Sequence, residues 1–107
     1  MTGVQTCALP ISPNDADLLV NLALVERADH QPEAAIELLL RALTYDPLHG
    51  MAHYNLGVLY DERGSVALAM EHYAAFLANG RPEQGTLLAE VQRRVRLLSG
   101  DLPPAER

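Results

Sequence analysis

The sequence predicts an all-α protein, an α-solenoid in which two helix–turn–helix repeats are followed by a C-terminal capping helix. Three observations predict this fold class. Residue types return at a fixed interval of 34 positions, as from Asn21 to Asn55. Apolar residues recur three and four positions apart, which is the spacing of one helix face. Gly and Pro separate the apolar segments, and a fixed interval of this length is typical of stacked helical hairpins.

The repetition extends over the middle of the chain without a gap. Asn55 aligns with Asn21, and Glu71 aligns with Glu37. Apolar and small residues match in the same register: Leu56 with Leu22, Gly57 with Ala23, Leu59 with Val25, Ala69 with Ala35, Met70 with Ile36, Tyr73 with Leu39 and Leu77 with Leu43. We therefore place repeat one at residues 16–49 and repeat two at residues 50–83.

The first repeat is predicted to contain helices at 16–28 and 32–45. Asn14 or Asp15 can cap the first helix, and Pro32 suits the first position of the second. His30 stands where repeat two has Gly64, and a left-handed turn is less favourable for His than for Gly. Asp46-Pro47 ends the second helix. The expected packing faces are Leu19, Leu22, Ala23 and Glu26 on the first helix, and Ala35, Leu38, Leu39, Ala42 and Leu43 on the second.

The second repeat is predicted to contain helices at 51–63 and 66–79. Ser65 is expected to cap the later helix, and Asn79-Gly80 is expected to stop it. A last helix runs from Pro82 or Glu83 to Leu98 and lacks the repeat pattern. Its apolar stripe is Leu87, Leu88, Val91, Val95 and Leu98. We interpret residues 84–99 as a capping helix that covers the last apolar face, ended by Gly100.

One stretch identifies the repeat type. It runs His53-Tyr54-Asn55-Leu56-Gly57-Val58-Leu59-Tyr60 and is followed by Gly64, Ala69, Tyr73 and Pro82. This pattern resembles the tetratricopeptide repeat (TPR) family, whose period is also 34 residues. The matching positions are Leu56, Gly57, Tyr60, Gly64, Ala69 and Tyr73 in repeat two, and Leu22, Ala23, Ala35, Leu39, Ala42 and Pro47 in repeat one. The resemblance covers about two thirds of the chain and implies a fold more strongly than a ligand.

The resemblance also implies a binding surface, because the first helix of each TPR pair lines a concave groove. Carried over residue by residue, the groove positions are Asp17, Val20, Asn21, Leu24, Arg27 and Ala28 in repeat one, and Met51, Tyr54, Asn55, Val58, Asp61 and Glu62 in repeat two. Asn21 and Asn55 are equivalent, and an Asn amide can both donate to and accept from a peptide backbone. Alternatively, the two Asn side chains could form hydrogen bonds only between helices, and both interpretations stay open.

One ligand class is disfavoured. TPR proteins that clamp a terminal carboxylate use Lys or Arg beside these Asn residues. Here the corresponding positions are Asp17, Met51, Gly85 and Ala89, which provide no cation. We expect an extended or helical peptide with apolar side chains as the partner.

Composition excludes other partners. The chain of 107 residues has a net charge of −6, which is unfavourable for binding a phosphate backbone, so no nucleic-acid partner is expected. No apolar run approaches the ~20 residues of a membrane helix, so no membrane insertion is expected. All 8 basic residues are Arg, which indicates a GC-rich genome and a bacterial source.

The sequence contains no catalytic constellation, so we predict neither enzyme activity nor a cofactor. His49 and His53 are four positions apart, a spacing that could place two ligands on one metal ion. No Glu or Cys completes such a site, and His53 occupies a packing position, so no metal site is predicted. The basic cluster Arg93-Arg94-Arg96 could contact an acidic partner or lipid head groups, but a solvated helix face explains it more simply.

The two ends of the chain are expected to lie outside the repeats. Residues 1–11 match the translation of a common sequencing-library adapter, codon by codon, and a signal peptide is disfavoured because they contain no basic residue. The only cysteine, Cys7, falls in this segment. We interpret 1–12 as artefactual and disordered, 13–15 as the tail of a lost repeat in a metagenomic fragment, and 100–107 as a disordered tail.

The function predicted from these observations is that of a protein–protein interaction scaffold or adaptor. Three alternatives remain: the interaction tail of a larger enzyme or signalling protein, an envelope-assembly TPR lipoprotein, and a purely structural role in self-assembly. Self-association through the exposed N-terminal face of repeat one is also expected. The cytoplasm is slightly favoured as the compartment, with the periplasm or envelope as the alternative if a signal peptide was lost.

Overall fold

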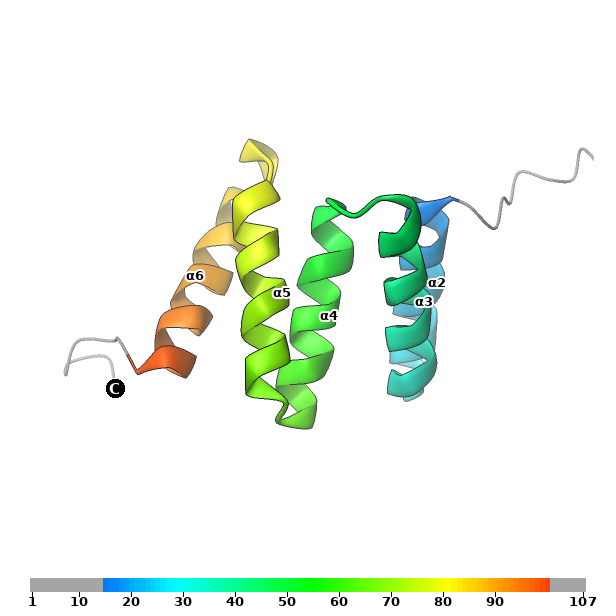
Figure 1. The fold of residues 1–107 in the computed structure, drawn as a ribbon, viewed down its shortest axis with the longest axis horizontal. Coiled ribbons are helices and arrows are strands. Elements are labelled where there is room, and N and C mark those ends of the chain that lie inside the picture. The colour runs from blue at the N-terminus through cyan, green and yellow to red at the C-terminus, as the bar shows by residue number, and fades with distance from the viewer. Residues whose placement is uncertain (1–14, 101–107) are drawn as a thin grey trace, which may run out of the picture. The chain divides into compact units, whose positions relative to one another are not determined.

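The computed structural model describes residues 15–100 (Figure 1). These residues form five α-helices and one short 3-10 helix, so the prediction of an all-α fold is confirmed. In chain order the elements are α2 (Ala16–Ala28), α3 (Pro32–Tyr45), α4 (Gly50–Arg63), α5 (Val66–Asn79), η1 (Pro82–Gln84) and α6 (Gly85–Ser99). They form two compact units that divide between Pro47 and Leu48. The predictions for residues 1–14 and 101–107 fall outside the described residues.

The first unit is the α2–α3 hairpin, and its ends follow the local sequence. The carboxylate of Asp15 accepts a hydrogen bond from the Leu18 amide at 3.1 Å and caps α2, as predicted. The turn that follows places His30 at a φ of 58°, so the left-handed turn expected at this position is present. The Gln31 amide closes the turn by donating to the Glu26 carbonyl at 2.8 Å.

Small residues let the two helices of this hairpin approach closely. Ala35 and Ala42 are fully buried, as is Leu39 between them. The face expected for α2 was partly wrong, since Leu22 is 43 % exposed whereas Val20 is only 4 % exposed. The reason is that α2 is apolar on most of its circumference, so the sequence spacing does not determine which side of the helix turns inward.

The second unit contains α4, α5, η1 and α6. His49 caps α4, because its Nδ1 accepts the Ala52 amide at 3.1 Å, and α4 begins one residue earlier than predicted. Gly64 ends α4 with a φ of 87°. The predicted Ser65 side-chain cap is wrong, because its hydroxyl makes no capping bond to α5. Backbone bonds close this turn instead, including one from the Ser65 amide to the Tyr60 carbonyl at 2.8 Å.

The α4–α5 hairpin is held together by a close approach and by large buried side chains. A Cβ added to Gly57 would lie 2.5 Å from Cδ1 of Tyr73, so only glycine leaves room for that ring. Leu56 and Phe76 are fully buried. The rings of Tyr54 and Phe76 meet with their centroids 5.4 Å apart.

The last helix packs on α5, as the capping-helix prediction requires (Figure 1). Gly80 ends α5 in an extended conformation, with φ at −71°, and a Cβ added there would overlap the end of the Leu88 side chain of α6, which would have to shift. The chain then forms η1, so α6 begins at Gly85, slightly later than predicted. Val91 is buried against α5, and Gly100 ends α6 at a φ of 79°.

Candidate functional site

The first candidate face is the exposed side of α2. Asp17, Asn21, Leu24 and Ala28 are exposed, and their spacing of three and four places them on one side of the helix. Leu24 is 40 % exposed, which leaves a large apolar side chain in contact with solvent beside the Asn21 amide. Arg27 is half-buried. Val20, which the sequence also suggested for this surface, lies in the interior.

The second candidate face is the corresponding side of α4, which is less exposed to solvent. Met51, Tyr54 and Val58 are half-buried. Asn55 is 2 % exposed, and its Nδ2 donates to the Met51 carbonyl at 2.8 Å. The two equivalent asparagines therefore differ in the structure: Asn21 faces solvent, whereas Asn55 is buried and bonded within its own helix.

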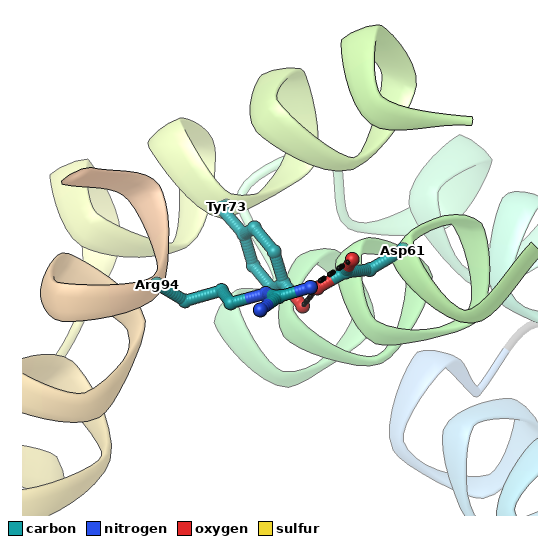
Figure 2. Close-up of polar contacts among 3 residues, drawn as sticks. All are labelled: Asp61, Tyr73 and Arg94. Atoms are coloured by element: carbon teal, nitrogen blue, oxygen red, sulfur yellow. Dashed lines mark hydrogen bonds and ion pairs between the residues drawn. The ribbon is translucent and has the colours of Figure 1, made fainter. Parts of the chain in front are cut away.

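The polar end of this α4 face is joined to the capping helix. Figure 2 shows the side chains of Tyr73 from α5 and Arg94 from α6 reaching the same carboxylate, that of Asp61. Arg94 donates from Nε and Nη2 to the two carboxylate oxygens, each at 2.7 Å. The Tyr73 hydroxyl donates to Oδ2 at 3.0 Å. Glu62, the neighbouring candidate, is exposed.

The electrostatics of this triad favour the charged forms of Asp61 and Arg94 and the neutral form of Tyr73. Hydrogen bonds from Arg94 hold the pKa of Asp61 below its usual range. Burial, together with the bond to Asp61, raises the pKa of Tyr73. The hydrogen bonds to Asp61 also raise the pKa of Arg94. At neutral pH the carboxylate and guanidinium are therefore both charged and the phenol is neutral.

The sequence did not indicate this triad. Arg94 was interpreted as part of a solvated basic face; its side chain is indeed 43 % exposed, but it also pairs with Asp61, which the sequence did not indicate. Asp61 and Arg94 are 33 positions apart, and no helical spacing rule connects residues on separate helices. Tyr73 matched the repeat signature as a packing ring, but the signature gives no information about its hydroxyl.

The histidines are arranged differently from the pair considered in the sequence. The Nδ1 atom of His49 is occupied by the α4 cap. His53 instead meets His72 of α5, with their Nδ1 atoms 3.1 Å apart. Within residues 15–100, no group of three or more His, Cys, Asp or Glu side chains is placed to hold a metal ion. In the same part of the chain, no helix has both the length and the apolar character to cross a membrane.

The comparisons with known proteins agree with the repeat pattern. The family model described as tetratricopeptide repeat matches residues 20–83, which is more than half of the 107-residue chain. No curated protein shows significant similarity. The matched segment begins within α2 and ends in η1, so it includes most of the first helical hairpin and all of the second. The chain belongs to the tetratricopeptide repeat family.

Proposed function

We propose that this protein is an interaction module that binds a segment of a partner protein through the first helices of its repeats, α2 and α4. TPR repeats generally mediate protein–protein interaction, and the family is typically non-catalytic. Binding by α2 and α4 is our proposal.

The observation that supports it most directly is the exposed α2 face. Asn21 and Leu24 lie three positions apart and both face solvent. An exposed amide can satisfy the backbone of an extended or helical peptide, while an exposed leucine can bury an apolar side chain of the same peptide. The partner segment is therefore expected to carry apolar side chains at regular spacing.

The α4 face contributes in a different way. Asn55 already donates to the Met51 carbonyl and is buried, so in this proposal it shapes the helix face and Asn21 makes the contact to the partner. Met51, Tyr54 and Val58 supply partly exposed apolar surface. The equivalence of the two asparagines in sequence thus does not extend to the role proposed for each.

The chemistry of these faces also restricts the ligand class. Asp17 is exposed on α2, and Met51 stands at the equivalent position of α4. A terminal carboxylate needs a cationic donor, and neither position supplies one. We therefore propose that the partner binds through an internal segment.

A peptide library displayed on phage, selected against the whole chain, tests this proposal. Binding of selected peptides is then measured by calorimetry with the variants Leu24→Asp and Val25→Asp. Both positions are exposed apolar residues of α2, but only Leu24 lies on the proposed face. Leu24→Asp should weaken binding about tenfold or more, a loss of about 1.4 kcal/mol, while Val25→Asp should bind as the unmodified chain does.

Circular dichroism of both variants controls for loss of folding. Peptides that bind equally well to Leu24→Asp would contradict the proposed surface. A peptide whose binding depends on its free C-terminal carboxylate would contradict the ligand class.

A further inference from the structure

Two imidazole rings from different helices meet at one edge of the α4–α5 hairpin. The Nδ1 atoms of His53 and His72 are 3.1 Å apart, and the ring centroids are 5.3 Å apart with the planes inclined by 30°. The nitrogen atoms are thus much closer together than the ring centres. The rings meet through their Nδ1 edges and not through their faces, so each Nδ1 is directed toward the other.

This contact is favourable only when one of the two nitrogens carries a hydrogen. In a neutral pair, one ring donates Nδ1–H and the other accepts at Nδ1 while it carries its own hydrogen on Nε2. A first added proton binds to Nε2 of the donor ring, which carries no hydrogen in the neutral pair. The bond then becomes charge-assisted and stronger, because its donor is now a cation.

A second proton has a different effect. The remaining basic atom is the acceptor Nδ1, which already faces the donor hydrogen. Protonating it would place two N–H groups against each other and two positive charges in contact, so the bond must break before that proton binds.

The groups around the pair shift the pKa of His72 in opposite directions. Burial and the nearby His53 lower the pKa of His72, while the neighbouring Glu71 opposes this shift. Tyr60 of α4 stacks on His72 with the centroids 5.7 Å apart, and Arg63 lies 5.8 Å from the Tyr60 ring centroid. His49 lies one helical turn before His53 on α4 and caps that helix through its Nδ1. The pair is therefore half-buried between α4 and α5, and Glu71 is a carboxylate that favours the charged form of His72.

We propose that His53 and His72 form a proton-sharing pair that accepts one proton and resists a second, which makes packing of α4 against α5 sensitive to acid. At neutral pH the pair joins the two helices by one hydrogen bond. In acid, the second proton breaks this bond and leaves like charges at the helix contact. The hairpin of repeat two is then destabilised while the rest of its core is unchanged.

Imidazole NMR on the whole chain labelled with nitrogen-15 tests the pair directly between pH 4.5 and 8. Two interacting rings should titrate in two separate steps, with a protected Nδ1–H signal that disappears in the second step. Two rings that titrate together in one step near the ordinary value of about 6.5 would overturn the proposal.

Thermal unfolding across the same pH range tests the consequence. His72→Phe keeps a ring of similar shape for stacking on Tyr60 but cannot titrate. His30→Asn is the matched control, because it removes a histidine that lies outside the pair and Asn tolerates the left-handed turn there. The unfolding midpoint temperature should fall as the pH drops below the ordinary histidine value of about 6.5 in the unmodified chain and in His30→Asn, and this fall should be smaller in His72→Phe. An identical fall in all three proteins would overturn the proposal.

A zinc titration at neutral pH separates proton sharing from metal binding. The directed Nδ1 contact predicts no rise of the unfolding midpoint with equimolar zinc chloride. A rise that is lost in His72→Phe would show that the pair is a metal site and would overturn proton sharing.

Discussion

At the scale of single residues, Gly57 determines how closely α4 and α5 pack. A Cβ at this position would lie 2.5 Å from Cδ1 of Tyr73 and 2.6 Å from its Cε1. The ring cannot move freely, because its hydroxyl is bonded to Asp61. One methyl group at Gly57 therefore affects both the helix contact and the hydrogen bond.

Gly57→Ala should accordingly lower the free energy of unfolding by about 1 to 3 kcal/mol, the usual cost of overpacking. Gly85→Ala is the control, since nothing lies within 4 Å of a Cβ there and Ala is favoured within a helix. Urea titration followed by circular dichroism measures both. Equal stability of the two variants would contradict the close approach.

His30 is the second residue with a direct effect on stability, because its φ of 58° is unfavourable for a residue with a Cβ. His30→Gly should raise the free energy of unfolding by about 0.5 to 1 kcal/mol, the relief of strain less the greater chain entropy of Gly. Asp29→Gly is the comparison, since Asp29 has a φ of −90° and gains nothing from Gly. Chemical denaturation measures the free energy of unfolding of both variants, and a lower value for His30→Gly than for the unmodified chain would contradict this prediction.

Some of these residue properties were predictable and others were not. Comparison of the repeats placed His30 opposite Gly64, and the polar residue before α2 predicted the Asp15 cap. Ser65 failed as a cap, because a residue type preferred at helix starts need not form the side-chain bond. The exposure of Leu22 was missed because most of α2 is apolar, which removes the contrast that identifies a buried face.

At the scale of elements, α6 is attached to the α4–α5 hairpin by packing on α5 and by the bond to Asp61. The side chain of Arg94 is 43 % exposed and that of Asp61 is 13 % exposed, so solvent partly screens the ion pair. Its contribution should therefore be near that of a surface pair, about 1 kcal/mol or less.

Arg94→Gln should lower the free energy of unfolding by about 1 kcal/mol or less at pH 6. The pKa of Asp61 is depressed in the folded state, so its contribution is present above the unfolded value of about 3.9 and is lost as pH falls through the lower folded value. The difference between the two proteins should consequently vanish in strong acid. Denaturation curves between pH 6 and 2.5 test this, with Arg96→Gln as the control, and a difference that persists unchanged at low pH would disprove the assignment.

The helices themselves were largely predictable, whereas the contacts between them were not. The limits of α2, α3 and α5 agree with the sequence pattern, because Pro and the repeat comparison define their ends. The beginning of α6 was less accurate, since the residues before it form a separate 3-10 turn. The pairs Asp61–Arg94 and His53–His72 each join different helices, and a single sequence gives no signal that connects them.

At the scale of the whole molecule, apolar side chains remain exposed on α2. Leu22 and Val25 face solvent, although repeat proteins bury their continuous core only by stacking units. We expect the chain to be marginally stable or to self-associate. A monomer in sedimentation that also melts sharply above about 65 °C would contradict this expectation.

Replacement of both Leu22 and Val25 by Lys should shift the protein toward monomer at a given concentration. Leu97→Lys is the comparison, because Leu97 is similarly exposed but lies on α6. Sedimentation velocity over a range of concentrations measures the distribution. If the α6 variant reduces association and the α2 variant does not, the apolar contact lies at the other end of the chain.

The bond between Asp61 and Arg94 also affects the net charge that α4 presents to a ligand. The sequence shows two adjacent acidic residues there, Asp61 and Glu62, but the guanidinium of α6 neutralises the first of them. The capping helix α6 thus changes the charge of the α4 face, although α6 is not part of that face. A protein truncated before α6 would present a more negative α4 and would be expected to select more basic ligands than the intact chain.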